Sequence, residues 1–453
     1  MPATNGSGAV ARAQREGPDV AWGWTEKQGG VIGTDERLPW GAAVALGVQH
    51  VLAMFGATVV APLIMGFDPN LAILFSGIGT IIFFLVVGGR IPSYLGSSFA
   101  FIGPVAAVTG GGGSIAQALG GIFVAGVLCA LIGIAVHLTG AGWIDALMPP
   151  LVTGAVVMII GLNLAGAARG LAGNDPLLAA VTILAIFAVG LRTRGLVSRL
   201  PILLGAVVGY LVALVLGGTS AAGRDLGGLH VSGVDLAKVA DAPWFGLPRF
   251  VRPEFTPSAI TLIAPVAVIL IAENTGHVKA VAAMTGTNLM PWLGRGFLGD
   301  GIATMVASLG GGTGVTTYAE NIGVMAVTRV FSTLNFLIAA VVAIGLGLSP
   351  KFGALVQTIP GGVLGGVTTV LFGLIAVTGA RIWVDNKVDF TLPENLFVAA
   401  VTLIVGAADY TVSVGQFALN GIALGTFAAI LLHAMFKTEA GKSESREVGE
   451  KST

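Results

Sequence analysis

Charged residues are scarce in this sequence. They make up 10% of its 453 residues, whereas soluble globular proteins carry about 25%. Lysine plus arginine and aspartate plus glutamate number 23 each, so the formal net charge is zero. The sequence therefore lacks the basic excess that nucleic-acid-binding surfaces usually have, and we expect no nucleic acid as a partner.

Cysteine and the common motifs of hydrolytic enzymes are also missing. The single cysteine, Cys129, lies in an apolar run and has no second cysteine with which to form an intrachain disulfide. Neither a His-Glu-x-x-His zinc motif nor a Gly-x-Ser-x-Gly nucleophile elbow occurs. We therefore expect no enzyme, no metal and no organic cofactor. Residues 1–37 contain no apolar core of the secretory type and are expected to form a polar tail.

Apolar residues are abundant instead. Hydrophobic residues make up 55% of the chain, and the mean hydropathy is +0.90. Because a spanning helix needs roughly 20 mostly apolar residues, the run over 40–436 predicts an all-α polytopic membrane protein surrounded by lipid. Glycine, proline and charged clusters divide this run into fourteen expected spans: 40–65, 71–87, 91–108, 115–138, 147–166, 176–191, 201–217, 259–276, 297–311, 314–328, 330–348, 355–378, 392–407 and 414–436.

A polar stretch separates the first seven spans from the last seven. We expect an extramembrane loop at 218–257, between a first repeat at 38–217 and a second at 258–436, followed by a polar tail at 437–453. With both termini in the cytoplasm, most lysines and arginines of the short loops lie on the cytoplasmic side, as in inner-membrane proteins. Two sets of seven spans run in opposite directions, an inverted repeat whose binding site lies where the repeats meet.

Both halves hold an interrupted segment at the corresponding span. Residues 96–101 in the third span and 315–320 in the tenth each follow glycine- or proline-rich breakers and carry β-branched or aromatic residues, which favour extended backbone. Extended backbone at membrane depth is tolerated only where protein buries it or where it lines a polar cavity. Each half is therefore expected to supply one short strand, followed by a helix whose unpaired N–H groups point at a ligand.

Two acids and a histidine lie inside the predicted spans. Glu273 and His277 are four residues apart, hence on one helix face, and Glu320 lies in the interrupted tenth span. Ionisable residues at this depth usually face a cavity. Carboxylates accept hydrogen bonds from ring N–H groups, and backbone N–H groups donate to ring carbonyls, so the set suits a small planar pyrimidinedione or oxopurine. Phe99 or Tyr318 could cover the ring face.

The same groups are candidates for binding a coupling proton. Buried carboxylates and imidazoles can exchange protons near neutral pH, so the candidates are Glu273, His277, Glu320 and His50. A buried structural pair would also explain Glu273 with His277, and an interhelical hydrogen bond would explain His50. The residues expected to support the site are Gln49, Ser98, Thr317 and Asn321.

From residue 38 to 437 the chain resembles the nucleobase–ascorbate transporter (nucleobase:cation symporter-2) family. Residues 320–329 read Glu-Asn-Ile-Gly-Val-Met-Ala-Val-Thr-Arg and fit the family signature. Members with glutamate at its first position are uracil permeases, whereas many purine permeases have glutamine there, so Glu320 favours uracil. Segments 264–270 and 312–320 are most similar to the pyrimidine permease of bacterial uracil degradation, whose relatives could also accept thymine and xanthine.

The resemblance implies several further properties. Substrate contacts are expected from Phe99, Glu273, His277, Tyr318, Ala319 and Glu320. Ala319 stands where well-known uracil permeases have glycine, so the strand is expected to approach the base less closely. The family also implies a core domain of spans 1 to 4 and 8 to 11, a gate domain of spans 5 to 7 and 12 to 14, alternating access, proton symport, and homodimers joined through the gate domains.

Two other transport functions compete with uracil import. A purine permease of the same family, carrying xanthine, would use the same site. Sulfate and bicarbonate carriers share the inverted-repeat build, but in this chain acids stand where an anion would need positive charge. Residues 437–453 also leave no room for the soluble C-terminal domain that many such carriers have.

Overall fold

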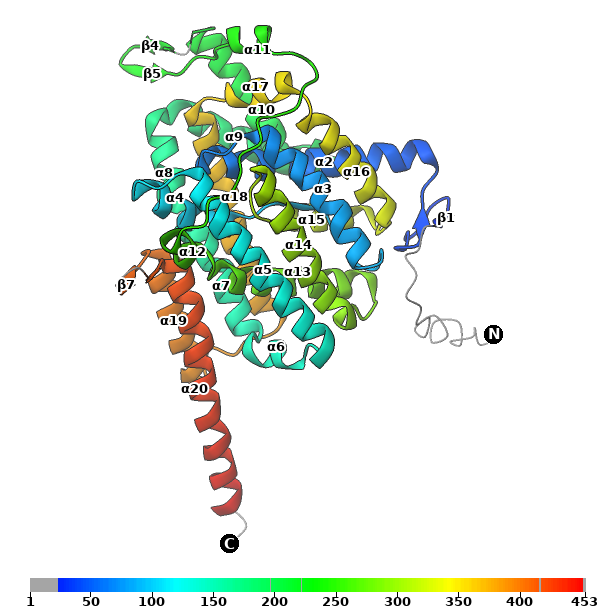
Figure 1. Cartoon of the computed structure of the whole chain (residues 1–453), viewed down its shortest axis with the longest axis vertical. Helices are drawn as coiled ribbons and strands as arrows, with labels where there is room; N and C mark the ends of the chain where they lie inside the picture. Colours follow the sequence, from blue (N-terminus) through cyan, green and yellow to red (C-terminus); the bar gives the residue numbers. More distant parts are fainter. Residues whose placement is uncertain (1–22, 196, 221, 415–416, 451–453) are drawn as a thin grey trace.

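The computed structural model describes residues 23–450, except 196, 221 and 415–416, so residues 1–22 of the expected N-terminal tail lie outside it. The described chain is mostly helical (Figure 1) and contains four two-stranded sheets within these residues. The expected helical class is therefore confirmed.

The first half of the chain begins with two short strands and continues through helices broken at glycine and proline. Its elements are β1 Thr25–Glu26, β2 Glu36–Arg37, α2 Trp40–Met65, α3 Pro69–Val86, β3 Leu95–Ser97, η2 Phe99–Phe101, α4 Ile102–Gly110, α5 Ile115–Thr139, α6 Gly142–Leu147, α7 Pro150–Asn163, α8 Ala165–Asn174, α9 Pro176–Arg192, η3 Val197–Arg199, α10 Pro201–Val212 and η4 Ala213–Gly217.

A polar segment with a small hairpin links the halves, and the second half repeats the pattern of long helices around one short strand. The elements are β4 Arg224–Leu226, β5 Leu229–Val231, α11 Ala237–Asp241, α12 Pro257–Ile263, α13 Val266–Thr285, η5 Met290–Trp292, α14 Leu293–Gly310, β6 Val315–Thr317, α15 Ala319–Thr328, α16 Thr333–Gly347, α17 Pro350–Gln357, α18 Gly361–Asp385, α19 Pro393–Ala407, β7 Val412–Val414, β8 Phe417–Leu419 and α20 Gly421–Glu450.

Several helices qualify as membrane spans by length and composition. Six do so within the described residues: α2, α3, α5, α7 with α8, α12 with α13, and α18. The pair α16 and α17 would make a seventh, although it is bent by 81°, and five shorter apolar helices accompany them. The chain is thus a multi-pass membrane protein.

Four expected boundaries were wrong. The eighth span continues to Thr285, because His277 and Lys279 are polar but helix-compatible. Residues 350–357 form a separate helix, α17, begun by a proline at its first position. The fourteenth helix starts at Gly421, after the β7–β8 hairpin, and continues through the expected polar tail to Glu450, because glutamate, lysine and arginine in this stretch favour helix.

The fourth error concerns the two strands, which are shorter than expected. Ser98 accepts a hydrogen bond from the Ala100 backbone N–H, so residues 99–101 turn into a 3₁₀ helix. In the second half the backbone turns helical at Ala319, directly after Tyr318. The expected strand residues beyond Ser97 and Thr317 therefore belong to turns and helix starts.

The two strands pair with each other. β3 and β6 are antiparallel, with Leu95 opposite Thr317 and Ser97 opposite Val315. Matched threonines hold their outer edges: Thr80 of α3 accepts a hydrogen bond from the Leu95 N–H at 2.9 Å, and Thr304 of α14 accepts one from the Val315 N–H at 3.2 Å. The backbone N–H and C=O groups of these non-helical segments, which water cannot reach inside the bilayer, thereby find hydrogen-bond partners within the protein.

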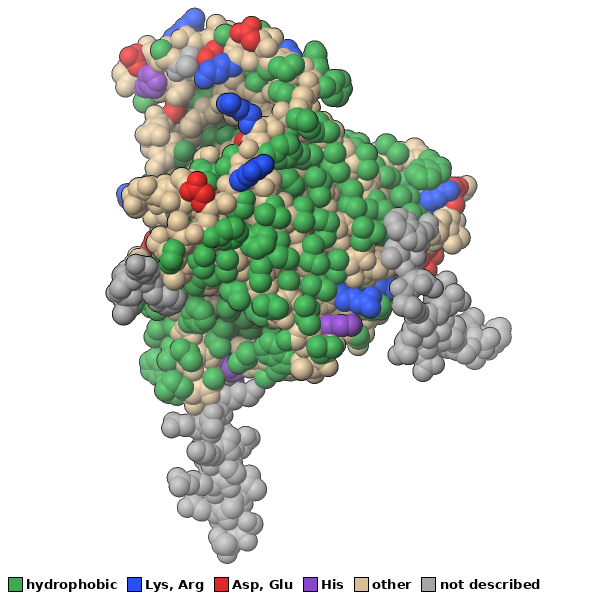
Figure 2. All heavy atoms as spheres, viewed as in Figure 1, with side chains coloured by type: hydrophobic (Ala, Val, Ile, Leu, Met, Phe, Trp, Pro, Cys, Tyr) green, Lys and Arg blue, Asp and Glu red, His purple; other side chains and the backbone are tan. Residues whose placement is uncertain are grey.

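The long helices pack mainly in two groups. In one, α14 lies along α5 and α3, and α16 lies along α3 and α2; in the other, α18 packs on α7, α8 and α9, while α19 packs on α20 and α7. The interior is apolar, and hydrophobic side chains also cover the middle of the molecular face in Figure 2, with charged side chains towards its edges. An apolar outer surface is the pattern expected of helices that face lipid.

Close contact between α5 and α14 depends on glycine. A Cβ atom added at Gly301 would lie 2.5 Å from the Ala130 N atom and 2.6 Å from the Gly126 O atom. Small residues of this kind let two helix backbones approach each other inside a membrane.

We predict that Gly301→Ala destabilises the protein by about 1–3 kcal/mol, because the added methyl group forces two packed helices apart. The matched control is Gly373→Ala in α18, where an added Cβ meets no atom within 4 Å. Thermal unfolding in detergent should show a lower Tm for the first variant only. Equal Tm values would contradict the packing described here.

Candidate substrate-binding site

One cavity lies beside the paired strands. It is lined by all six residues that were expected to contact substrate, together with two of the expected supporting residues, Ser98 and Thr317. Three separate parts of the sequence bring these side chains together: β3 with η2, the helix α13, and β6 with the first turn of α15. On the opposite wall, α7 and α18 contribute Val157, Ile160, Ile375 and Thr378.

Glu273 and His277 are held by the two strand segments. Glu273 lies beside the Ser98 hydroxyl, and its Oε2 atom has no hydrogen-bond partner among the described residues. The Nδ1 atom of His277 lies 2.8 Å from Thr317 Oγ1. Because both side chains project from one face of α13, the carboxylate and the imidazole point at the same cavity with hydrogen-bonding capacity to spare.

Tyr318 is locked in place by contacts on several sides. Its hydroxyl donates to the Ser97 carbonyl at 2.9 Å and accepts from the Thr58 hydroxyl at 3.2 Å. Its ring lies so close to Gly96 that an added Cβ there would come within 2.5 Å of ring atoms. Glycine at position 96 is thus required by the ring of Tyr318, which directly follows the neighbouring strand.

Two helix starts face the cavity. Helix α15 begins at Ala319, and Glu320 lies in its first turn. The 3₁₀ turn beginning at Phe99 leads directly into α4. The first N–H groups of a helix have no partner within it and carry a partial positive charge. The cavity therefore offers backbone donors next to carboxylate acceptors.

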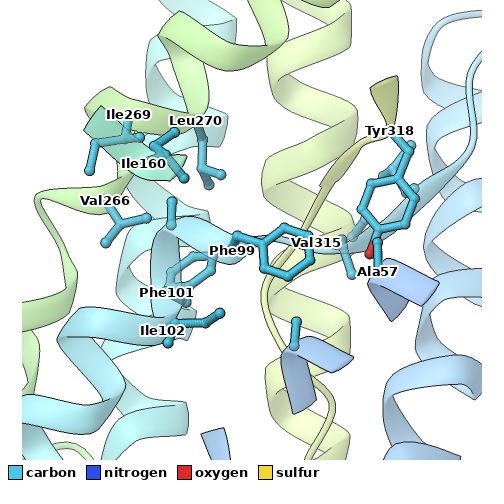
Figure 3. Packing of buried hydrophobic residues seen from close by; sticks show 14 of the residues in the cluster. Ala57, Phe99, Phe101, Ile102, Ile160, Val266, Ile269, Leu270, Val315 and Tyr318 are labelled. Atoms are coloured by element: carbon cyan, nitrogen blue, oxygen red, sulfur yellow. The ribbon is translucent and has the colours of Figure 1, made fainter. Parts of the chain in front are cut away.

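Phe99 lies between the strand segment and the opposite wall. Its ring is among the buried side chains drawn in Figure 3 and meets Phe372 of α18 edge to face, with ring centroids 5.5 Å apart. A ring in this place can lie against a flat ligand, since offset and edge-on aromatic contacts are favourable.

The expected contribution of the first span is indirect. His50 is fully buried against Phe336 and bonds Asn321 through its Nδ1 atom at 3.0 Å, while its carbonyl accepts from the same amide at 3.1 Å. Neither His50 nor Asn321 lines the cavity, although Asn321 follows Glu320 directly. Gln49 faces a different cavity, which it shares with Arg199.

Glu320 also borders a second opening. A neighbouring cavity is lined by Glu320, Val324 and Arg199, and by residues at the start of α10. Glu320 consequently lines both the cavity beside the strands and this neighbouring cavity, which extends to Arg199 at the end of η3.

Asp300 is a third buried acid near the site, and the sequence reasoning missed it. It lies in α14, is 1% exposed, and accepts a hydrogen bond from Asn274, the residue after Glu273. It is close enough to Glu273 and Cys129 to act on both electrostatically. An aspartate inside the expected ninth span met the same criterion that identified the other two acids.

Comparison with known proteins shows the family to which the chain belongs. Residues 41–415 match a family described as the permease family. "Putative pyrimidine permease RutG" of Escherichia coli (strain K12) is 54% identical, over 91% of this chain and 93% of the relative. The uracil permease of Paenibacillus larvae is 41% identical over 90% and 96%, and that of Escherichia coli (strain K12) is 39% identical over 90% and 94%.

Solved structures agree with the fold. The transmembrane domain of the cyanobacterial bicarbonate transporter BicA matches with a TM-score of 0.57 at 17% identity, covering 87% of this chain and 97% of that one. SLC26A9 matches with a TM-score of 0.62 at 13% identity, covering 87% and 65%. The molecule thus has the fold of a class of membrane transporters. Within it, the chain belongs to the permease family, and the resemblance to nucleobase transporters is confirmed.

We predict that Asp300→Ala lowers the thermal stability of the purified protein, whereas Asp300→Asn changes it less. Alanine leaves the buried Asn274 amide without its acceptor, at a cost of about 1–3 kcal/mol. Asparagine keeps a side-chain oxygen that can accept the hydrogen bond from Asn274. Unfolding curves of both variants in detergent provide the measurement, and equal Tm values for the two would show that the hydrogen bond is unimportant.

Proposed function

We propose that this protein is a proton-coupled symporter that imports uracil by alternating access. The observation that carries the proposal is the convergence of Glu273, His277 and Glu320 on one cavity with two helix starts and the ring of Phe99. Its relatives are named permeases, which supports transport and not catalysis.

Uracil matches the donors and acceptors of this cavity. The carboxylates of Glu273 and Glu320 accept hydrogen bonds from ring N–H groups, and the N–H groups at the start of α15 donate to ring carbonyls. Phe99 covers the ring face. The opposite wall is largely apolar, so a substrate has to find its polar partners on the strand side. A ligand lacking one of these edge groups leaves a buried polar atom unpaired, at a cost of about 1–3 kcal/mol.

The choice of a pyrimidine rests on the relatives. The proteins between 39% and 54% identical over most of both chains are named for uracil or pyrimidine. Thymine and xanthine are further candidate substrates, with xanthine less favoured. Anion transport is disfavoured, because the likeness to bicarbonate and anion carriers concerns the fold and two carboxylates line the cavity.

The coupling proton is proposed to bind among Glu273, His277 and Glu320, with His50 as a more distant candidate through Asn321. A carboxylate must lose its negative charge or pair it before its surroundings become apolar during closure. Uptake that collapses on addition of a protonophore supports symport, and uptake that persists argues against it.

The proposed architecture has fourteen spans in two inverted repeats. The matched threonines Thr80 and Thr304, each bonding the first residue of a short strand, support the repeat. The two packing groups of helices support a core domain and a gate domain. We further propose cytoplasmic termini in the inner membrane and homodimers formed through the gate domains.

We predict that Glu273→Gln and Glu320→Gln each reduce uracil uptake roughly 10- to 100-fold, the loss expected when a charge-assisted hydrogen bond is replaced by a neutral one. The control is Glu254→Gln, an exposed acid in the linker between the halves. Radiolabelled uptake is normalised to the amount of protein in the membrane. Normal uptake by either site variant would remove that residue from the proposed site.

We predict that unlabelled thymine competes with labelled uracil for uptake, whereas sulfate in the same excess does not. Thymine keeps both ring N–H groups and both carbonyls, which are the groups that the cavity pairs. Xanthine and hypoxanthine in parallel assays measure how far a second ring is tolerated. Inhibition by sulfate alone would overturn the assignment of a nucleobase.

A further inference from the structure

The described part of the expected N-terminal tail is folded. Residues 24–37, here called the strap, bend back on themselves at Gly29 and Gly30, which both have positive φ. The Thr25 N–H donates to the Asp35 carbonyl at 3.0 Å, and the Lys27 N–H donates to the Arg37 carbonyl at 2.8 Å.

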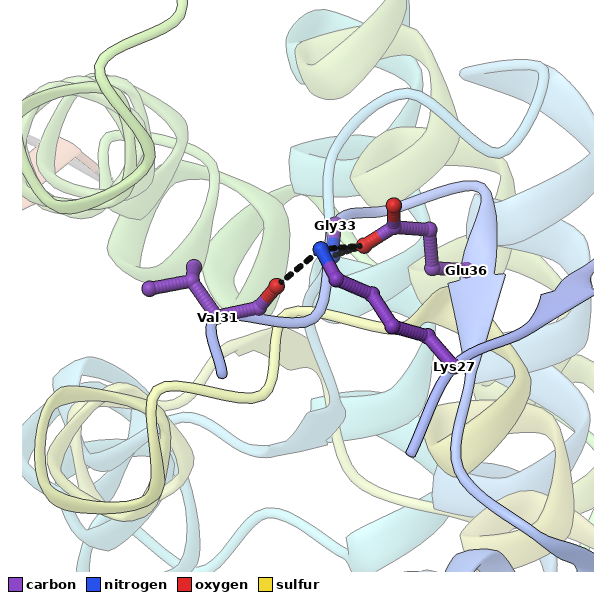
Figure 4. A network of polar contacts seen from close by, with 4 residues as sticks. All are labelled: Lys27, Val31, Gly33 and Glu36. Carbon is purple, nitrogen blue, oxygen red and sulfur yellow. Dashed lines mark hydrogen bonds and ion pairs between the residues drawn. The ribbon is translucent and has the colours of Figure 1, made fainter. Parts of the chain in front are cut away.

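Charged side chains close the strap on itself. The Lys27 Nζ atom lies 2.8 Å from Glu36 and donates to the Val31 carbonyl at 2.7 Å, as Figure 4 shows. The same glutamate accepts from the Gly33 N–H at 2.8 Å. Arg37 pairs with Glu26 at 2.7 Å. The charged residues of the expected polar tail therefore make contacts within the segment.

The strap is joined to the link between α15 and α16 by backbone hydrogen bonds. The Ile32 N–H donates to the Arg329 carbonyl at 3.0 Å, and the Phe331 N–H donates to the Ile32 carbonyl at 2.8 Å. Ile32 and Val330 thus form a parallel bridge. The link begins with Arg329 in the left-handed region, φ 57°, which ends α15.

Ile32 is the apolar anchor of the strap. Its side chain is fully buried and packs in a cluster with Leu46 of α2, Val324 of α15 and Val330. The residue before it, Val31, is 52% exposed. Two neighbouring β-branched residues of similar size therefore differ in burial, and Ile32 is the one that belongs to the cluster containing Val324 of α15.

A second anchor lies at Thr333, the first residue of α16. Its hydroxyl donates to the Thr34 carbonyl at 3.0 Å and accepts from the Trp24 indole N–H at 3.0 Å. Trp24 also lies near Phe84 at the end of α3, with ring centroids 6.2 Å apart. The strap consequently connects the ends of three helices.

Helix α15 connects the strap to the candidate site. It has ten residues, a length of roughly 15 Å, with Glu320 in its first turn and the strap at its last. Val324, which belongs to the same buried cluster as Ile32, is one turn from Glu320. At its start α15 follows β6, which is paired with β3, and at its end it is held by the strap through backbone hydrogen bonds and side-chain packing. A short helix fixed at both ends in this way has little freedom to tilt.

We propose that the strap is a positioning element for α15 and that Ile32 is its positioning residue, holding the helix so that Glu320 and the N–H groups beside it face the cavity. This rests on the proposed function in one respect, namely that the cavity binds uracil. The position of α15 itself can be measured without a substrate.

The test compares Ile32→Ala with the matched control Val31→Ala in the full-length protein. Uracil uptake in cells gives KM and the maximal rate per transporter. Hydrogen–deuterium exchange of purified protein without substrate follows the backbone of residues 319–328. Ile32→Val serves as a conservative rescue, and Thr333→Val removes the second anchor in case Ile32→Ala does not fold.

We expect Ile32→Ala and Thr333→Val to speed exchange in α15 and to raise the uracil KM roughly five- to tenfold with the maximal rate changed less. Val31→Ala and Ile32→Val should match the unmodified protein. Exchange and KM that are the same in Ile32→Ala and Val31→Ala would overturn the proposal. If the unmodified protein takes up no uracil, the proposed function fails, and the exchange data alone decide whether the strap holds α15.

Discussion

The pairing of β3 with β6 is the constraint on which the site depends. Inside a bilayer, a backbone that leaves the helical form must find its hydrogen bonds within the protein. Here two interrupted segments, more than 200 residues apart in the chain, form hydrogen bonds with each other. Thr80 and Thr304 accept the hydrogen bonds of the N–H groups at the first residue of each strand. Because the strands are paired, the residues that follow each of them, Phe99 after β3 and Glu320 after β6, line the same cavity.

The cavity is asymmetric because the helices pack in two groups. The strands, α13 and α15 bring carboxylates, an imidazole and hydroxyls to one wall, while α7 and α18 bring mostly aliphatic side chains to the other. A ligand held by hydrogen bonds to one group and by apolar contact with the other can move with the first as the contact with the second changes. This division of polar and apolar walls suits the alternating access that we propose.

Much of the site could be predicted from the sequence. Ionisable residues in apolar spans are rare and usually face a cavity, which identified Glu273, His277 and Glu320, and the matched breakers of the third and tenth spans located the strands. The same criterion should have found Asp300. Local turn chemistry was harder to predict: Ser98 ends one strand by bonding the Ala100 N–H, and residues 350–357 became a separate helix at a proline.

The sequence by itself determined that the chain resides in a membrane, and the signature at 320–329 identified its family, because hydropathy and motifs are local properties of the chain. Only the tertiary structure decided that β3 pairs with β6, that the Tyr318 ring packs on Gly96, that His50 is hydrogen-bonded to Asn321, and that residues 24–37 dock on the link between α15 and α16. Each of these depends on contacts between residues far apart in the chain, whose geometry no local pattern records.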